Sequence, residues 1–361
     1  MPESVDLFVP GRLCLFGEHS DWAGGHRRQN SEIGKGYALV APTNQGNYAT
    51  ARAIPSGKLI FRSAAFQNLL EVPLDDKELL KLAEEGKEFS YIAGVAHEIL
   101  VNFNGHDKGL NINKRSYGIE IDNYKTDLPI KKGLSSSASV CVLVAKAFKE
   151  VYDLPLSTRG LMNIAYNGET NTPSRCGRLD QACAYLNPVL MTFDADRIQV
   201  EEIKPNHLLY FVIVDLNSKK NTKKILTDLN KGFPFPTNHL EKRKHEYLGR
   251  INTDLVSRAL EAIKQGNPQE IGELMNKAQN KFDEYLAPAC PKELTAPKLH
   301  QVLYCPKIQP FVYGGKGVGS QGDGCAQLIA RDESSQAQLI EMLNSYRELN
   351  VHAIPLTIHA D

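Results

Sequence analysis

Leu128-Pro-Ile-Lys-Lys-Gly-Leu-Ser-Ser-Ser-Ala-Ser139 is the stretch that decides the fold of this chain. Apolar residues recur at helical spacing after it as far as Phe148, so the sequence predicts an amphipathic helix that begins at the serines. Gly133 allows a tight turn, and the first turn of a helix presents unpaired backbone N–H groups and the positive end of its dipole. With Lys131 and Lys132 just upstream, this end favours an anion such as a polyphosphate. The alternative interpretation is a serine N-cap on an ordinary helix.

Two carboxylates follow this helix in the chain. The sequence predicts a second helix over Ser157–Thr170, capped by Ser157 and carrying Glu169 near its C-terminal end. The motif Gly177-Arg-Leu-Asp-Gln181 then places Asp180 after a glycine, at the start of a short helix. Asp180 is a candidate catalytic group, although an acid at a helix N-terminus is commonly just a partner for the dipole.

Before the serine stretch, the N-terminal segment carries an unusual group of polar residues. Leu7–Val9 and Leu13–Phe16 read as short strands broken by Pro10-Gly11, and Gly17-Glu-His-Ser-Asp-Trp-Ala-Gly-Gly25 follows them directly. Carboxylates and an imidazole presented together suit the recognition of several hydroxyl groups, because each makes a directional hydrogen bond. The candidate binding residues of this segment are Glu18, His19, Asp21 and Trp22. A solvated turn is the alternative.

The order of the predicted elements indicates an α+β protein with two domains. His26–Lys35 reads as a polar loop or flap, and Gly36–Pro42 and Asn47–Ile54 read as two strands. The pattern changes near residue 206, where a strand, helices, paired strands, a helix and a last strand suit a small α+β sandwich. We therefore expect an N-terminal domain over 1–205 and a C-terminal domain over 206–361.

A glycine-rich segment, Gly314-Gly-Lys-Gly-Val-Gly-Ser-Gln-Gly-Asp-Gly324, lies in the second of these domains. Gly317, Gly319 and Gly322 match the GxGxxG pattern of dinucleotide-binding turns. That turn must open a helix, whereas the residues that follow here read as a strand. A glycine loop between two strands can still bring backbone N–H groups close to a ligand. The chain has no GxxxxGK[ST] sequence, which excludes a P-loop enzyme.

Composition limits the partners and the compartment. The 361 residues carry 42 Lys and Arg and 42 Asp and Glu, so no charge excess points to nucleic acid or to an anionic membrane. The 7 cysteines, an odd number without a CxxC pair, indicate buried thiols in a reducing compartment rather than disulfides or a zinc site. Because no signal-peptide pattern and no long apolar run occur, we expect a soluble cytoplasmic protein that acts on a small molecule.

The motifs together resemble those of the GHMP kinases (galacto-, homoserine, mevalonate and phosphomevalonate kinases), and most of all the galactokinase branch. Residues 10–25 are close to the galactokinase signature PGRxNLIGEHTDYNGG. Gly133–Ser139 is similar to the phosphate-binding loop of the family almost letter for letter. Gly177–Gln181 is similar to its GxxDQ motif, and Gly314–Gly324 to its glycine-rich third motif. The resemblance covers essentially the whole chain, although only these motifs are close.

The resemblance implies a fold and a reaction. The fold would be α+β with an N-terminal ribosomal protein S5 domain 2-like domain, a C-terminal ferredoxin-like α/β sandwich, and the active site in the cleft between the domains. The reaction would be the Mg²⁺- and ATP-dependent phosphorylation of a monosaccharide at its anomeric hydroxyl, by a monomer or a homodimer. Phosphoryl transfer needs alignment, a metal and neutralised charge more than covalent chemistry.

The resemblance also implies a role for each matching residue. Asp180 would contact the acceptor hydroxyl as a base or an electrostatic guide, with Arg12 beside it. Mg²⁺ would be held by Ser136 and Glu169. The residues expected to bind ATP are Gly133, Leu134, Ser135, Ser136, Ser137, Ala138, Gly317 and Gly319. Those expected to bind the sugar are Glu18, His19, Asp21, Trp22 and Arg178.

Departures from the galactokinase pattern bear on the substrate. The polar segment His26–Lys35, with Arg27 and Arg28, is an addition, and Arg178 stands at a position that is usually apolar. These arginines could pair with a carboxylate or phosphate, so galactose, a modified or acidic sugar and a heptose all stay open. The alternative is that they are solvated or contact ATP. In the third motif, the departures from glycine are Gln321 and Asp323.

Two other functions stay open at this point. A kinase of another acceptor such as mevalonate would keep Asp180 and Gly133–Ser139, which we call the serine loop. It would have no use for Glu18, His19 and Asp21 as a hydroxyl-binding group. A sugar sensor without catalysis could share the same fold. The intact metal and acceptor residues argue against the sensor.

Overall fold

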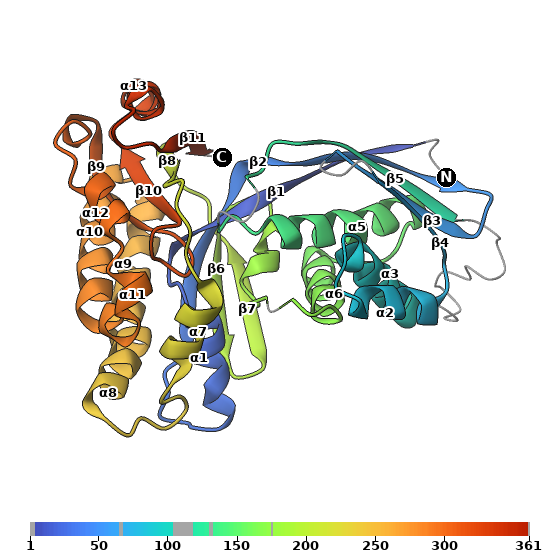
Figure 1. The fold of residues 1–361 in the computed structure, drawn as a ribbon, viewed down its shortest axis with the longest axis horizontal. Helices are drawn as coiled ribbons and strands as arrows, with labels where there is room; N and C mark the ends of the chain where they lie inside the picture. The colour runs from blue at the N-terminus through green and yellow to red at the C-terminus, as the bar shows by residue number, and fades with distance from the viewer. Residues whose placement is uncertain (1–3, 65–67, 104–117, 130–132, 175, 360–361) are drawn as a thin grey trace. The chain divides into compact units, whose positions relative to one another are not determined.

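The computed structural model describes residues 4–64, 68–103, 118–129, 133–174 and 176–359 (Figure 1). Lys131 and Lys132, predicted to add charge beside the serine loop, lie outside these ranges. The chain forms two compact units, one from residues 1–12 and 45–186 and the other from residues 13–44 and 187–361. Two long strands, β1 (Val5–Phe16) and β2 (Gly36–Ile54), run on from one unit into the other. The domain boundary at residue 205 stays a prediction.

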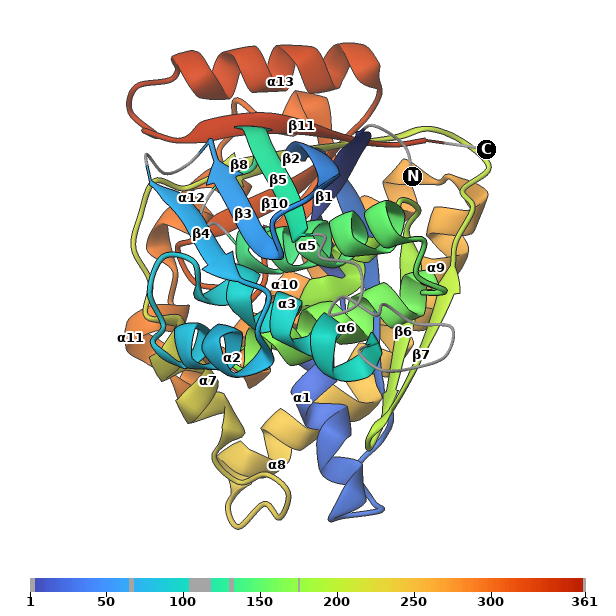
Figure 2. The ribbon, with the colours of Figure 1, turned by 90° about the vertical axis from the view of Figure 1, so that its right-hand side faces the viewer.

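The first unit is a sheet with helices on one face (Figure 2). Besides the long strands, its elements are β3 (Lys58–Ser63), β4 (Leu69–Pro73), α2 (Asp76–Glu84), α3 (Ser90–Phe103), β5 (Gly118–Thr126), α5 (Ser136–Tyr152), α6 (Thr158–Thr170) and the 3₁₀ helix η2 (Asp180–Ala184). The strand order is β4-β3-β5-β2, with β3 and β5 parallel and the other pairs antiparallel. The four α-helices share one hydrophobic core with the strands.

Helix α5 is the buried centre of the first unit. Its apolar stripe, which includes Leu143 and Phe148, is shielded from solvent as the helical spacing predicts. Ser139 is also fully buried. Its hydroxyl accepts a hydrogen bond from the Asn47 amide of β2 at 2.8 Å and donates one to the Val9 carbonyl of β1 at 3.1 Å. These bonds tie the helix to both long strands, so they fix where its N-terminal turn lies.

The second unit contains a four-stranded antiparallel sheet in the order β11-β8-β10-β9. Its strands are β6 (Val189–Asp194), β7 (Arg197–Glu202), β8 (Leu209–Asp215), β9 (Val312–Gly317), β10 (Cys325–Ala330) and β11 (His352–Ile358). Its helices are α1 (Ser20–Gly25), η1 (His26–Arg28), α7 (Thr222–Asn230), α8 (His239–Glu246), the π-helical turn η3 (Tyr247–Ile251), α9 (Asn252–Gln265), α10 (Pro268–Tyr285), η4 (Ala287–Ala289), α11 (Pro291–Leu294), α12 (Pro297–Leu303), η5 (Gln309–Phe311) and α13 (Glu333–Ser345). The β6–β7 hairpin pairs with residues 36–40 of β2.

Helices lie on both sides of strand β9. On one side, α12 and α13 enclose a core with the sheet that includes Leu328 and Leu339. On the other side, α10 approaches the strand so closely that a Cβ added at Gly314 would lie 2.1 Å from the carbonyl oxygen of Gly272. The glycines of β9 are therefore needed for packing as well as for the loop that follows.

The structure confirms the predicted α+β class and the main helices, and it differs from the prediction in three segments. β1 continues through Pro10-Gly11. Among the described strands β1 pairs with β2 alone, so its other edge is unpaired, and a proline without an N–H is tolerated there. Gly36–Pro42 and Asn47–Ile54 are parts of one strand. Within Gly17–Gly25, for which the sequence predicted no helix, Ser20–Gly25 forms α1.

None of the helices in the described ranges has the length and apolar character needed to cross a bilayer.

We predict that Gly94→Ala destabilises the first unit. A Cβ at Gly94 of α3 would lie 2.2 Å from the carbonyl oxygen of Gly168 of α6, so the two helices would have to separate. Overpacking of this kind lowers the free energy of unfolding by about 1–3 kcal/mol, which a urea titration measures. Gly249→Ala is the matched control, because a Cβ there meets open space, and we expect it to be neutral or stabilising. Equal stabilities for the two variants would contradict the close helix contact.

Candidate functional site

Asp180 lies among hydrogen-bond donors in the first unit. Its Oδ1 atom accepts hydrogen bonds from the Arg12 guanidinium and, at 2.8 Å, from the Ser135 hydroxyl. Its Oδ2 atom accepts one from the Gly177 backbone N–H at 3.1 Å. Arg12 is buried and also donates to the Gly133 carbonyl at 2.6 Å. The donors hold the carboxylate in one orientation, and because its side chain is 24% exposed a ligand can still reach it.

The serine loop turns through left-handed backbone conformations. Gly133 has φ of 79°, and Ser135, which is not a glycine, has φ of 56°. A non-glycine residue keeps such a conformation only when its surroundings hold it there, as the bond from Ser135 to Asp180 does. Helix α5 begins at Ser136, so its first-turn N–H groups point out of the loop. The predicted helix start is confirmed, and the binding of an anion there stays a prediction.

Glu169 is a buried carboxylate near Asp180. It is 1% exposed, and its Oε2 atom accepts a hydrogen bond from the Gln181 amide at 2.8 Å. The Ser137 hydroxyl also hydrogen-bonds to it. Burial, and then the charge of Asp180, raises the pKa of Glu169 to about 7. These contacts provide neutral donors and no cation, so a divalent ion would supply the charge that the buried carboxylate needs.

The structure refines which groups could hold a metal. We predicted Ser136 and Glu169 as ligands, but the serine in contact with Glu169 is Ser137. No cluster of three His, Cys, Asp or Glu side chains within the described part of the chain is suited to a metal ion. A carboxylate and a hydroxyl with phosphate and water as the remaining ligands is the arrangement typical of Mg²⁺. The role of Ser136 stays a prediction.

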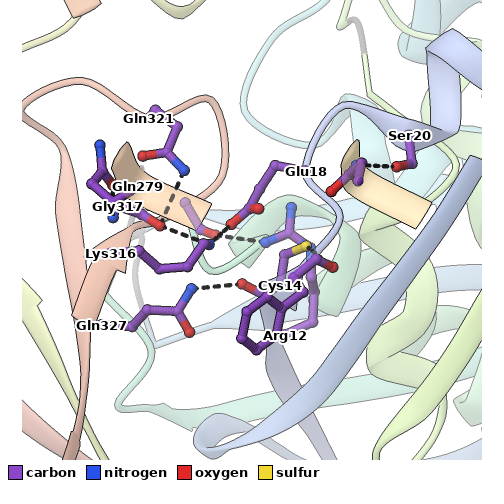
Figure 3. A network of polar contacts seen from close by, with 12 residues as sticks. Arg12, Cys14, Glu18, Ser20, Gln279, Lys316, Gly317, Gln321 and Gln327 are labelled. Carbon is purple, nitrogen blue, oxygen red and sulfur yellow. Dashed lines mark hydrogen bonds and ion pairs between the residues drawn. The ribbon is translucent and has the colours of Figure 1, made fainter. Parts of the chain in front are cut away.

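Glu18 forms a buried ion pair with Lys316 in the second unit (Figure 3). Glu18 is 7% exposed and Lys316 only 1%, so both charges are withdrawn from water. Lys316 lies on β9, where its Nζ also donates to the Gly317 carbonyl at 3.1 Å. The N-terminal motif and the glycine-rich motif, read as separate in the sequence, are thus joined by a salt bridge.

Amide side chains surround this ion pair and support the start of the glycine loop, as Figure 3 shows. The Gln279 side-chain oxygen accepts the Gly317 N–H at 2.8 Å, and the Gln321 amide donates to the Gly317 carbonyl at 3.3 Å. Gln327 of β10 donates to the Cys14 carbonyl at 2.8 Å. Asp323 accepts the Leu299 N–H at 2.9 Å. The two departures from glycine, Gln321 and Asp323, therefore act as internal supports of the loop.

His19 is a buried base of the second unit. Its backbone is left-handed, with φ of 69°, and its ring stacks on Phe282 of α10 at 6.3 Å between centroids. Burial, followed by the charges of Lys220 and Lys316, lowers the pKa of His19 to about 3. Its Nδ1 atom accepts a hydrogen bond from the Trp22 indole N–H at 3.2 Å. The imidazole is therefore neutral at ordinary pH.

The added arginines have partners within the chain. Arg27 donates to Asp194 at 2.8 Å, and Arg28 lies 3.4 Å from Asp196, so both bind the β6–β7 hairpin. Arg178 is exposed and lies over the ring of Tyr166, 5.0 Å from its centroid. The segment His26–Lys35 is thus anchored by its own charges.

The predicted residues fall into two groups, one in each unit. The first unit brings together the serine loop, Arg12, Asp180 and Glu169, and the second brings Glu18 and His19 to the strand that carries Gly317. Sequence reasoning missed Lys316, although a lysine between glycines directly after one of the predicted paired strands was a signal. It also missed Gln279, for which the sequence offers no signal. Asp21 and Gly319 stay predictions.

The chain is similar to known galactokinases over most of its length. Residues 90–187 match the family described as GHMP kinases N terminal domain. The galactokinase of Bacillus subtilis (strain 168) is 25% identical over 378 residues, which cover 95% of this chain and 89% of that protein. The galactokinase of Enterococcus faecalis is 23% identical, with coverages of 94% and 89%.

Solved structures confirm the predicted fold class. The Lactococcus lactis galactokinase complexed with galactose superimposes with a TM-score of 0.72 at 18% identity, covering 99% of this chain and 94% of that one. The Methanococcus jannaschii mevalonate kinase also gives a TM-score of 0.72, at 19% identity and with coverages of 99% and 98%. The fold alone therefore does not separate a sugar acceptor from mevalonate.

We predict that Glu169→Gln removes a pH dependence of stability. Because the folded-state pKa of Glu169 is about 7 against 4.5 normally, the folded chain binds more protons than the unfolded chain between these values. Wild-type stability should then fall as pH rises through this window and stay lower above it, by about 1–3 kcal/mol relative to the variant. Urea titrations with a chelator at pH 4.5 to 8 measure the free energy of unfolding of both proteins. Glu71→Gln, at an exposed pair, is the control, and parallel curves for wild type and Glu169→Gln would contradict the shift.

We predict that Lys316→Met destabilises the second unit and that adding Glu18→Gln restores most of the loss. Removing the lysine takes away the buried cation that pairs with Glu18, which costs about 3–5 kcal/mol, whereas replacing both partners removes both charges. Denaturant unfolding measures the free energies. Lys58→Met, at an exposed pair with Glu71, should cost less than about 1 kcal/mol. A Lys316→Met variant as stable as Lys58→Met would rule out a buried pair.

Proposed function

We propose that this chain phosphorylates a sugar. It is a GHMP kinase of the galactokinase-like branch, and hence an ATP-dependent phosphotransferase with an alcohol group as acceptor. The acceptor is a monosaccharide, and its anomeric hydroxyl receives the γ-phosphoryl group. The observation that carries the proposal is the contact of Asp180 with Arg12 and Ser135, since it connects the candidate base to the phosphate-binding loop.

The first unit supplies the transfer chemistry in this proposal. The acceptor hydroxyl donates a hydrogen bond to Asp180, and its oxygen attacks the γ-phosphorus as the bond to the bridging oxygen of ADP breaks. The hydroxyl proton passes to the Asp180 carboxylate. Arg12 keeps that carboxylate oriented, and the first-turn N–H groups of α5 with the serine hydroxyls bind phosphate oxygens.

The residues of the first unit fit Mg²⁺. Glu169 and Ser137 offer hard oxygen ligands side by side, and burial and the charge of Asp180 raise the pKa of Glu169, which has only neutral donors among its contacts within the described ranges. Ser136, predicted from the resemblance, is the other candidate hydroxyl. When bound, Mg²⁺ supplies neutralisation of phosphate charge.

The second unit supplies recognition of the acceptor. Glu18 and His19, with Asp21, present acceptor and donor atoms suited to hydroxyl groups. Arg27 and Arg28 already pair with Asp194 and Asp196, and Arg178 lies over the ring of Tyr166, so all three added arginines have contacts within the chain. We therefore rank neutral hexoses such as galactose before uronic acids and heptose phosphates.

Mevalonate is the second candidate acceptor. The equal TM-scores of the galactokinase and mevalonate kinase structures favour keeping it. The motif around Glu18 and His19 weighs against it, since mevalonate offers few hydroxyl groups to such residues.

The experiment is ADP release from Mg-ATP across a panel of galactose, glucose, mannose, uronic acids, heptose phosphate and mevalonate, with product position read by phosphorus NMR. We expect turnover with a neutral hexose and a sugar 1-phosphate as product. Turnover with mevalonate alone would reject the sugar, and stabilisation by a sugar without ADP release would indicate a sensor.

We predict that Asp180→Asn lowers kcat at least about 10²-fold on the preferred acceptor, because the amide cannot take the hydroxyl proton. Nucleotide affinity, measured by calorimetry, should change little. Arg52→Ala, at an exposed arginine of β2 that pairs with Glu120 in the same unit, is the control, and we expect near-normal kcat. Near-normal turnover of Asp180→Asn would remove this residue from the mechanism.

A further inference from the structure

His19 has one ring nitrogen whose role the fold leaves open. The side chain is 6% exposed and lies between Trp22 and Phe282. Its Nε2 atom is buried and has no hydrogen-bond partner within the part of the chain that the structure describes. Buried polar atoms are nearly always paired, so an unpaired one in a binding motif points to a ligand atom.

The Trp22 indole determines which nitrogen carries the proton. An indole N–H only donates, so the His19 Nδ1 atom at 3.2 Å must be an acceptor without a proton. A neutral imidazole then carries its single proton on Nε2. The groups that face this ring include Lys316 and Lys220, whose positive charges oppose a second proton. His19 Nε2 is consequently a donor that needs an acceptor.

Trp22 is itself held in place by aromatic contacts. Its ring meets that of Phe233 edge to face, with centroids 5.1 Å apart, and it lies 6.3 Å from His26 at 82°. Phe233 in turn stacks on His245 at 3.9 Å. The indole N–H is thus aimed at His19 by packing from α1, η1 and the segment before α8.

We propose that Trp22 is a positioning residue that fixes the His19 proton on Nε2, and that His19, already expected to bind the sugar, therefore meets a sugar oxygen as a hydrogen-bond donor. The second half of the statement rests on the proposed function, and the first does not. His19 is then neither a base nor a metal ligand through Nε2, because that atom already carries hydrogen. Trp22, predicted to touch the sugar, acts through His19 instead.

The tautomer is tested on the whole protein without any substrate. Nitrogen-15 NMR of histidine-labelled protein separates protonated from unprotonated ring nitrogens, and the His19 signal is assigned by its loss in His19→Gln. We expect wild-type His19 to stay neutral with Nε2–H at every pH from about 5 to 8. Trp22→Phe keeps a ring against Phe233 but removes the N–H, so a share of Nδ1–H tautomer should appear. A charged His19 in this range, an Nδ1–H form in wild type, or an unchanged tautomer in Trp22→Phe would overturn the assignment.

Kinetics on the preferred acceptor test the use of the proton. The amide nitrogen of glutamine can replace Nε2–H, whereas that of asparagine is too short and lies nearer the Nδ1 position. We expect KM for the sugar to rise about tenfold in His19→Asn and in Trp22→Phe, with kcat changed less than about twofold, and to change little in His19→Gln. The control is His352→Gln, at an exposed histidine of β11, with no effect on KM. Equal losses in His19→Gln and His19→Asn would show that packing, not the donor, matters.

Sugars that lack one hydroxyl identify the bonded oxygen. The analogue without the oxygen that His19 binds should lose affinity in wild type and lose nothing further in His19→Asn. If every analogue lost as much in His19→Asn as in wild type, His19 would bind none of these hydroxyls. If no sugar is phosphorylated at all, the proposed function fails while the NMR measurement still decides the tautomer.

Discussion

The first unit depends on the Arg12 guanidinium, which holds three segments of chain at one point. The backbone N–H of Arg12 donates to the Leu134 carbonyl at 3.1 Å, one Nη atom donates to the Gly133 carbonyl and the other to Asp180. A lysine could not replace it, because the planar fork directs its donors along fixed lines while a single ammonium does not. Arg12 therefore fixes three parts of this unit relative to one another: its own part of β1, the serine loop and the GxxDQ motif.

Each unit has one buried candidate carboxylate, Glu169 in the first and Glu18 in the second, and the two are stabilised in ways that match their proposed roles. Glu18 is paired with Lys316, so its charge is balanced within the protein. Glu169 receives neutral donors, Ser137 and Gln181, and its pKa is raised as a result of burial and of Asp180. A carboxylate with a resident cation suits recognition of a neutral group, whereas one without a cation suits the binding of a metal ion.

The glycine-rich motif shows how one pattern can serve a different structure. Its loop joins β9 to β10, whereas a dinucleotide-binding turn must open a helix, so the dinucleotide interpretation is wrong. Gly314 is required by the close approach of α10 at Gly272, and the loop itself is fixed by side chains. Gln321, whose backbone is left-handed at φ 65°, and Asp323 take up hydrogen bonds that plain glycines could not make.

Local patterns determined the helix that begins at the serines, the capped helix ending at Thr170 and the strands around the glycine loop, because capping and apolar periodicity act between neighbours in the chain. The four motifs likewise carry the resemblance to the GHMP kinases. The tertiary structure alone decided that Lys316 pairs with Glu18, 298 positions away, and that Ser137 is the serine beside Glu169. It also decided which nitrogen of His19 accepts the Trp22 proton. These features depend on the distance and direction between side chains brought together by folding, and no spacing in the sequence encodes them.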